Sequence, residues 1–178
     1  NPMEISPSIP EMEVSESWIK LLAKQMDVAV ITIGRNSGEG SDLSEKAFGL
    51  IPEEAKLIEN VSREFHAMKK KVIIVMNISN VMEVASWRNY ADAILLAWQG
   101  GQEGGNSITD ILCGAVNPSG KLTASFPMTY RDVPSYNNFP GTPKDASNPE
   151  YSLYEEGIYL GYRYYNTFGI RPAYEFGY

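Results

Sequence analysis

Val28-Ala29-Val30-Ile31-Thr32-Ile33 is an uninterrupted run of apolar and β-branched residues that stops at Gly34. It shows no alternation between apolar and polar positions, which is typical of a strand covered on both faces. Such strands occur almost only where helices cover both sides of a parallel sheet. The run therefore predicts an α/β fold.

The segments on either side of this run have helical patterns. Upstream, apolar residues at three- and four-residue spacing predict a helix that starts after a cap at Ser15 or Ser17. Downstream, Pro52 and the two acidic residues after it predict the first turn of a second helix, with an apolar side that faces the core. The order helix, strand, helix is that of an α/β domain.

The same cycle continues through the middle of the chain. Val72 to Met76 and Ala93 to Trp98 are further apolar runs that predict strands, and a helix is expected from a cap at Asn106 to Cys113. Strand, loop, helix, strand implies parallel pairing with right-handed crossovers. We expect a three-layer α/β/α sandwich around a mostly parallel sheet, with Cys113 as a small core residue.

The last third of the chain departs from this cycle. Residues 121–126 form a strand-like run, and residues 127–148 are rich in Pro, Asn, Ser and Gly, which predicts a long irregular excursion. The aromatic stretch Tyr159 to Tyr165 has the composition of a strand. We expect it to supply an antiparallel edge strand.

Composition sets the domain limits and excludes several partners. The 178 residues suit one compact domain, and three prolines within residues 1–13 favour a linker, which leaves residues 14–178 for the domain. A net charge of −7 predicts no nucleic-acid partner, and the basic run 69–71 is interpreted as a solvated helix end. No stretch has the roughly 20 apolar residues of a membrane span, so no membrane partner is expected.

The loop after the first strand is the richest in chemical groups. Arg35-Asn36-Ser37-Gly38-Glu39-Gly40-Ser41-Asp42 holds two carboxylates, a guanidinium, an amide and two hydroxyls. Ligands of open α/β sheets bind at the carboxyl ends of strands, where this loop begins. Glycoside hydrolysis needs one carboxylic acid as proton donor and a second carboxylate, and Glu39 could be the first. The same residues could instead have no catalytic role. Glu39 and Asp42 would then be solvated loop acids, Asp42 or Ser44 would cap the next helix, and Arg35 would pair locally.

Other chemistries lack their motifs. The glycines fit neither the dinucleotide fingerprint nor the phosphate loop, and no G-x-S-x-G elbow is present. His66, the only histidine, lies inside a helical pattern and is interpreted as a surface residue rather than a catalytic base. No Cys/His spacing or calcium loop occurs, so we predict no metal and no cofactor. The glycine-rich stretch 99–107 is interpreted as a tight crossover from a strand to a helix. The alternative is a ligand contact by Gln102 or Glu103.

Four stretches, in this order along the chain, resemble glycoside hydrolase family 3, the β-glucosidase and β-xylosidase family, and specifically its second, α/β-sandwich domain. They are residues 34–42 (GRNSGEGSD), 97–106 (AWQGGQEGGN), 117–122 (NPSGKL) and 154–164 (YEEGIYLGYRY). Together they cover the chain from the first strand to near its end. The resemblance implies a retaining exo-β-glycosidase, with a β-glucoside or related carbohydrate as substrate.

The resemblance also implies roles for individual residues. In the family, the nucleophile is an aspartate on a preceding (β/α)8 barrel, and the acid/base glutamate commonly comes from a loop of this second domain. Glu39 matches that acid/base position, and Arg35, Ser37 and Asp42 would orient it or contact the sugar. Many relatives carry arginine after the loop aspartate, where this chain has Leu43.

A barrel of this kind needs about 250 residues, so the chain lacks the nucleophile and is expected to be inactive alone. The barrel is then its expected intramolecular partner, and the family implies a periplasmic or secreted enzyme rather than a cytoplasmic one. Aromatic residues, including Trp87, Trp98 and the tyrosines of 151–165, are expected to form an exposed patch that other domains cover. The alternative is a non-catalytic scaffold or sugar-binding module that shapes the active-site entrance.

Overall fold

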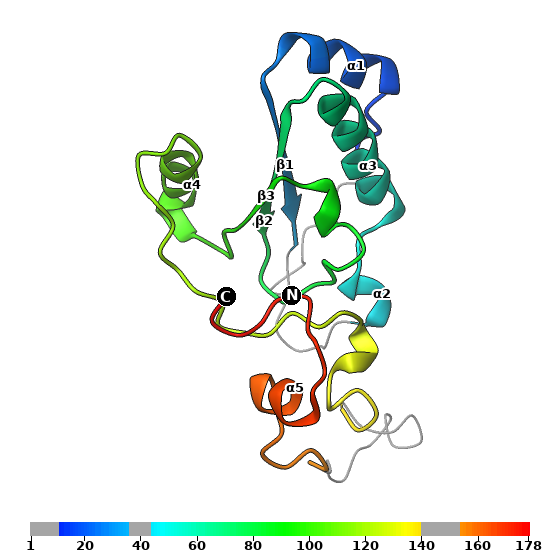
Figure 1. The fold of residues 1–178 in the computed structure, drawn as a ribbon, viewed down its shortest axis with the longest axis vertical. Coiled ribbons are helices and arrows are strands. Elements are labelled where there is room, and N and C mark those ends of the chain that lie inside the picture. Colours follow the sequence, from blue (N-terminus) through cyan, green and yellow to red (C-terminus); the bar gives the residue numbers. More distant parts are fainter. Residues whose placement is uncertain (1–10, 36–43, 140–153) are drawn as a thin grey trace, which may run out of the picture. The chain divides into compact units, whose positions relative to one another are not determined.

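A computed structural model describes residues 11–35, 44–139 and 154–178 (Figure 1). The described chain divides into two compact units. The first contains residues 11–35, 50–80 and 86–118, and the second contains residues 44–49, 81–85, 119–139 and 154–178. Each unit is described by itself below.

The first unit is built on a parallel sheet in the order β1-β2-β3. Its strands are β1 (Val28–Gly34), β2 (Lys71–Asn77) and β3 (Ala93–Leu96). Ile31 of β1 lies opposite Ile74 of β2, which in turn lies opposite Ile94 of β3. The three apolar runs thus form the predicted parallel sheet.

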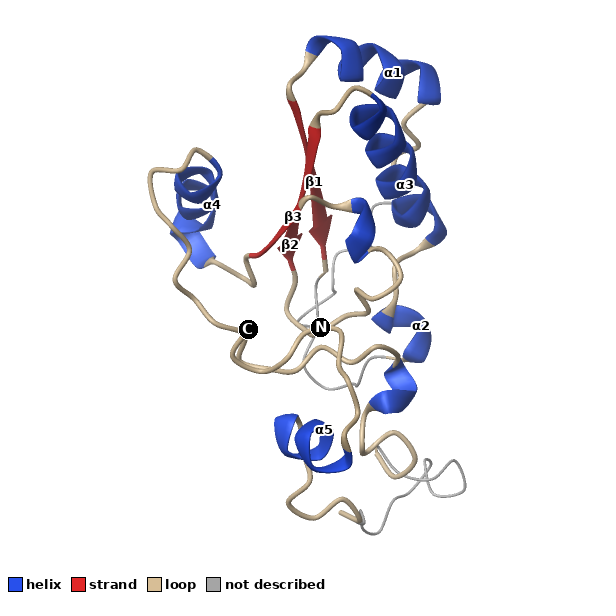
Figure 2. Ribbon diagram, viewed as in Figure 1, coloured by secondary structure: helices blue, strands red, loops and turns tan. Residues whose placement is uncertain are grey.

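Helices lie on both sides of this sheet (Figure 2). α1 (Glu16–Gln25) begins at Ser15, whose side chain accepts a hydrogen bond from the backbone N–H of Trp18 at 3.3 Å, as expected for a cap. α3 (Pro52–Ala67) packs against α1, β1 and β2, and its Ile58 and Phe65 are buried. α4 (Gly104–Leu112) lies on the opposite side of the sheet from α3. The α/β class is confirmed.

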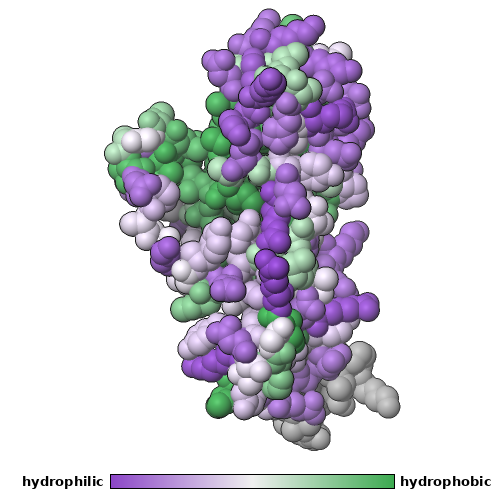
Figure 3. Space-filling model, viewed as in Figure 1, coloured by the Kyte–Doolittle hydropathy of each residue, from purple (hydrophilic) through white to green (hydrophobic). Residues whose placement is uncertain are grey.

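The side of the sheet that faces α4 is less covered than the sequence predicts. Val28 and Val30 are 45% and 50% exposed, whereas Ile31 and Ile33 are buried. Side chains alternate between the two faces of a strand, and in the described chain only one face of β1 packs against a helix layer. Figure 3 shows hydrophobic residues gathered around α4. The expectation that β1 is covered on both faces was wrong for this chain.

Two expectations for the fourth helix were also wrong. α4 begins at Gly104, so Asn106 lies inside its first turn and donates to the Glu103 carboxylate at 2.7 Å. Cys113 is exposed rather than part of the core. The reason is that α4 buries none of its residues against the sheet, so its last turn has no core to enter.

The second unit contains two short helices, α2 (Glu45–Phe48) and α5 (Tyr162–Phe168). α5 replaces the expected edge strand at Tyr159 to Tyr165. Gly161 before it has φ 53° and Gly169 after it has φ 65°, conformations that glycine adopts readily, and they delimit a helix against the β propensity of the tyrosines.

Antiparallel pairing within the described residues is limited to one bridge, between Phe126 and Tyr174. The strand-like run 121–126 therefore forms no strand of the sheet. Short 3-10 helices complete the described structure at η1 (Arg88–Tyr90), η2 (Gly101–Glu103) and η3 (Tyr130–Asp132).

The aromatic residues divide between core and surface. Trp87 is buried, at 3% exposure, so the prediction that it is exposed was wrong. Tyr154, Tyr159 and Tyr162 are exposed as predicted, and Trp98 is intermediate. Tyr165 is 4% exposed, so the prediction was wrong for it. Within the ranges given above, no helix combines the length and apolarity that crossing a bilayer requires.

Candidate functional site

Of the four predicted site residues, the structure places one. Ser37, Glu39 and Asp42 lie outside the described residues. Arg35 is described and directly follows the last residue of β1. The geometry around Arg35 therefore defines how the candidate loop leaves the sheet.

Arg35 is held by backbone and side-chain hydrogen bonds. Its backbone N–H donates to the carbonyl of Asn77, the last residue of β2, at 3.1 Å. Its guanidinium Nη1 donates to the carbonyl of Gly34 at 2.8 Å. Nη1 and Nη2 also donate to the two carboxylate oxygens of Glu54, the first at 2.5 Å. This bidentate pairing is the strongest geometry available to arginine and a carboxylate.

Glu54 is a buried acid in the first turn of α3. It is 5% exposed, and its Oε2 also accepts a hydrogen bond from the backbone N–H of Ile51 at 3.0 Å. A carboxylate at this position offsets the positive end of the helix dipole and satisfies a free backbone donor. The hydrogen bonds that Arg35 donates to Glu54, supported by the negative charge of the carboxylate, raise the pKa of Arg35 above its ordinary value.

Sequence reasoning identified Glu54 as a first-turn acid but missed its partner. The two residues are 19 positions apart, and no local pattern joins them. The only signal was chemical, because a buried carboxylate at a helix start needs a cation. The sequence allows a local partner for Arg35, whereas the partner in the structure is distant in sequence.

The carboxyl ends of the three strands meet at one edge of the sheet. Gly34 at the end of β1 lies opposite Asn77 at the end of β2, and β3 ends nearby at Leu96. Two residues beyond β3, Trp98 has a φ of 49°, which is uncommon for a bulky side chain. Strained backbone of this kind often occurs at functional sites, and Trp98 belongs to the stretch 97–106 that resembles the family.

The glycine-rich stretch after Trp98 forms a tight crossover, as interpreted from the sequence. Gly101 adopts a φ of 64°. A Cβ on Gly100 would lie 2.9 Å from the Cα of Gly104, which is too close for a side chain. The structure therefore explains these glycines by backbone geometry, and a ligand contact by Gln102 or Glu103 stays a hypothesis.

A cavity of about 180 Å³ in the first unit lies between the end of β3 and α4. It is lined mainly by apolar side chains. They are Leu95, Leu96, Ala97, Ile108 and Ile111, together with Gly100, Gly104 and Ser107. It holds no titratable group and offers packing surface rather than chemistry.

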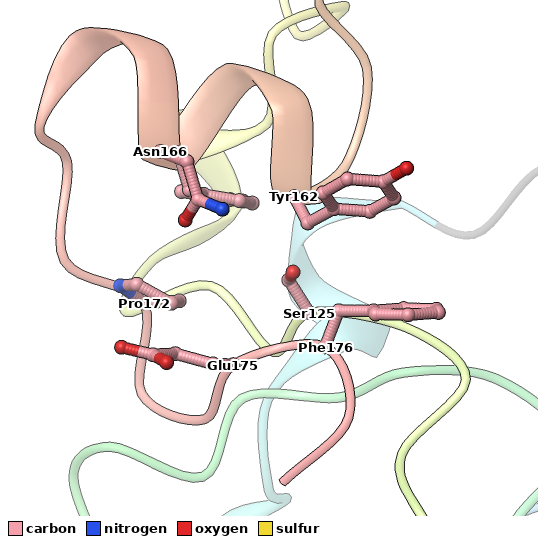
Figure 4. Close-up of a pocket in the computed structure, with 7 residues that line it drawn as sticks. Ser125, Tyr162, Asn166, Pro172, Glu175 and Phe176 are labelled. Carbon is pink, nitrogen blue, oxygen red and sulfur yellow. The ribbon is translucent and has the colours of Figure 1, made fainter.

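A second cavity, of about 150 Å³, lies in the second unit beside α5 (Figure 4). Its polar groups come from Ser125, Asn166 and Glu175, and the tilted rings of Tyr162 and Phe176 lie 5.0 Å apart at one side. Ser125 Oγ is buried without a hydrogen-bond partner among the described residues. This set could bind a small polar group, but it has no nucleophile and base pair, and Arg35, the one predicted site residue that the structure describes, does not line it.

His66 belongs to a cluster at the amino end of β2. His66 Nε2 lies 2.8 Å from Asp92 Oδ2, which also accepts from the backbone N–H of Val72 at 2.9 Å. Lys71 Nζ donates to Asp92 Oδ1 at 2.6 Å. The hydrogen bond from Lys71, followed by those from Val72 and His66, lowers the pKa of Asp92 far below its usual range. The cluster joins α3 to the sheet at the edge opposite to Arg35, which fits the surface interpretation of His66.

Within the described ranges, no group of three or more His, Cys, Asp or Glu side chains is placed to hold a metal ion. The part of the candidate site that the structure describes is the carboxyl edge of the sheet, up to Arg35 at the end of β1.

Comparison with solved structures gives the same fold over almost the whole chain. β-Glucosidase 3B from Thermotoga neapolitana, solved in complex with glucose, superposes with a TM-score of 0.92 at 56% identity, over 98% of this chain and 24% of that one. A β-glucosidase from Paenibacillus barengoltzii superposes with a TM-score of 0.83 at 33% identity, over 95% and 18% of the two chains.

Curated relatives agree with these structures. An exo-α-(1→6)-L-arabinopyranosidase from Bifidobacterium longum is 33% identical over 99% of this chain and 22% of its own length. A β-glucosidase from Ruminococcus albus is 34% identical over 94% of this chain and 17% of its own length. The chain thus spans about a fifth of the length of the relatives it matches. The sequence profile of the glycosyl hydrolase family 3 C-terminal domain matches residues 14–162, and the chain belongs to that family.

Proposed function

We propose that this chain is the second domain of a retaining exo-β-glycosidase, with β-glucosides as the preferred substrates, and that Glu39 is the acid/base of the reaction. The observation that carries the proposal is the carboxyl end of β1 at Gly34 and Arg35, which residues 36–43 follow in the sequence, in a chain of family 3. Ligands of open α/β sheets bind at this edge. Glu39 matches the acid/base position of the family.

The proposed reaction has two steps. A carboxylate from another domain attacks the anomeric carbon, while the Glu39 carboxylic acid protonates the departing oxygen. Glu39, now a carboxylate, then removes a proton from the water that releases the sugar. One side chain thus acts first as acid and then as base.

The nucleophile comes from a (β/α)8 barrel of the same protein, and the 178-residue chain is inactive alone. The small share of each relative that the chain spans, 24% of the Thermotoga enzyme, leaves ample length for such a barrel. We further propose that residues 1–13 form a linker and that residues 14–178 form the family 3 domain. The start of the family match at residue 14 supports this division.

The other loop residues serve the acid/base or the sugar. Ser37 and Asp42 supply a hydroxyl and a carboxylate that bind sugar hydroxyl groups, and Arg35 orients the loop or contacts the substrate. The solved relative in complex with glucose supports a carbohydrate ligand for the whole protein. The Bifidobacterium relative carries the name of an arabinopyranosidase, so an α-L-arabinopyranoside is the first competing substrate to assay.

The alternative is a non-catalytic module that supports the barrel and shapes the entrance of its site. The exposure of large aromatic residues such as Tyr154 and Tyr159 favours it, because such surfaces mark interfaces or sugar contacts. It predicts that Glu39 has little effect on the rate.

The decisive experiment measures hydrolysis of aryl β-glucosides by the 178-residue chain, the full-length protein and its Glu39→Gln variant. We expect no activity in the chain and a loss of about 100- to 10,000-fold in the variant on weakly activated substrates. Highly activated aryl glucosides need little protonation, so their loss is smaller, and external azide restores turnover.

Glu59→Gln, an exposed acid on α3, is the matched control and keeps the wild-type rate. Activity in the isolated chain refutes the division of the site between domains. Wild-type rates in Glu39→Gln favour the scaffold alternative.

We also propose a periplasmic or secreted location for the full-length protein, as in the resemblance described above. Fractionation of cells that express it from its own gene tests this. Recovery of all activity in the cytoplasmic fraction contradicts it.

A further inference from the structure

The backbone where the candidate loop begins is fixed from three directions. The N–H of Arg35 extends the β1–β2 pairing by one hydrogen bond, to Asn77. The Arg35 guanidinium turns back onto the carbonyl of Gly34, and its two terminal nitrogens hold both oxygens of Glu54. Arg35 lies four positions before Glu39, so the loop leaves the sheet from a point that has little freedom.

Glu54 is a rigid anchor for this contact. It is buried, and its Oε2 is also bound to the N–H of Ile51. It belongs to the first turn of α3, whose Ile58 and Phe65 are fixed in the core. A displacement of its carboxylate would therefore require movement of the helix start.

Most hydrogen-bond donors of the Arg35 side chain are already used within the protein. Three of the five N–H groups of a guanidinium are used in the contacts to Gly34 and Glu54, and the side chain is only 26% exposed. A sugar-binding arginine would instead direct its bidentate face toward the ligand. Here that face is occupied by a residue of the protein itself.

We propose that Arg35 is a positioning residue that acts through Glu54 to set the place of Glu39, and that it does not contact the sugar. This inference rests on the proposed acid/base role of Glu39. A general acid must lie within about 3 Å of the atom it protonates. An error of about 1 Å can cost about 100-fold in rate, so a loose loop start should weaken proton transfer.

The test compares Arg35→Lys, Glu54→Gln and the double variant in the full-length protein, with aryl β-glucosides of graded leaving-group ability. Each single variant is expected to lower kcat for weakly activated substrates by about 10- to 100-fold, with little change for highly activated ones. KM should stay near the wild-type value because sugar contacts are intact. The double variant should be no worse than either single variant, since both residues act as one unit.

A matched control uses a partly exposed pair on α3, the helix that carries Glu54. Arg63 Nε lies 3.1 Å from Glu64 Oε1, and Arg63→Lys with Glu64→Gln repeats the same chemical changes away from the sheet edge. These variants should behave like the wild type. Glu54→Asp, which keeps the charge and shortens the reach, replaces Glu54→Gln if that variant fails to fold.

Three results would overturn the proposal. A rise in KM shared by all substrates in Arg35→Lys, with normal kinetics in Glu54→Gln, would make Arg35 a sugar contact. Equal losses on every substrate in both variants would indicate a structural role alone. If Glu39→Gln, assayed alongside, shows no dependence on the leaving group, the acid/base assignment fails first and the positioning role with it.

Discussion

At the scale of single residues, Lys69 has a backbone conformation that is costly for a residue with a Cβ. Lys69 follows α3 with a φ of 59°, and its N–H donates to the carbonyl of His66 at 2.9 Å. Left-handed backbone just after a helix is a common termination, but it favours glycine over residues with a Cβ. The side chain is exposed, so little packing opposes a change there.

Lys69→Gly should therefore stabilise the protein by about 1 kcal/mol, because glycine adopts left-handed backbone without strain. Chemical unfolding of the 178-residue chain measures it. Lys20→Gly, at an exposed position inside α1, should instead destabilise by about 1 kcal/mol. Equal losses in both variants would show that the conformation of Lys69 is not strained.

The two members of the Arg35–Glu54 pair should differ in their effect on stability. Arg35→Met leaves the Glu54 carboxylate buried without its cation and should cost about 3 kcal/mol. Arg63→Met breaks a pair whose arginine is half exposed and whose carboxylate is less buried than Glu54, and should cost less than about 1 kcal/mol. Arg35→Met combined with Glu54→Leu should recover part of the loss, since no charge is then buried. Unfolding free energies that do not separate Arg35→Met from Arg63→Met would contradict the burial argument.

At the scale of elements, Asp92 joins the end of α3 to the start of β2. Its carboxylate accepts hydrogen bonds from Lys71 and Val72, with His66 at 2.8 Å. These contacts favour the charged form, so the folded-state pKa lies below the unfolded one. The resulting stability is fully present above the unfolded pKa of about 3.9 and is lost as the pH falls toward the folded value.

The stability difference between the wild type and Asp92→Asn should accordingly be constant near neutral pH and shrink below about pH 4. Because the Asp92 carboxylate is 23% exposed, solvent screening limits the size of this stability difference. Asp27→Asn, which removes an exposed carboxylate before β1, is the control for the loss of one negative charge. A difference that does not change between pH 7 and pH 3 would remove Asp92 from the acid response.

At the scale of the whole chain, uncovered apolar surface is the main feature. Within the described sheet, β1 is an edge strand, and its Val28 and Val30 are exposed. An exposed apolar edge strand is a known route to self-association, which charged residues prevent. Further large apolar side chains are exposed in the second unit, among them Tyr154, Ile158 and Phe168.

We therefore expect the 178-residue chain to self-associate at high concentration and Val30→Lys to reduce this, with little loss of stability. Light scattering across a concentration series measures it. Ile31→Lys, which places the same charge on the buried face of β1, should unfold the chain. A monodisperse wild-type chain would show that the exposed face of β1 has no tendency to associate.

The sequence by itself determined the elements whose signals are local. The β-branched runs of β1 and β2, the periodicity of α3 and the cap at Ser15 each depend on neighbours within a few residues, and each was predicted close to its final bounds. The family was also readable, because its motifs are contiguous stretches of sequence.

Only the tertiary structure decided the features that depend on distant residues. α5 forms where the tyrosines favour a strand, since flanking glycines and packing outweigh a weak propensity. Trp87 is buried and Cys113 exposed because packing depends on which elements meet, not on residue type. The Arg35–Glu54 pair joins positions 19 apart at a strand end and a helix start, a proximity that folding creates and no local pattern encodes.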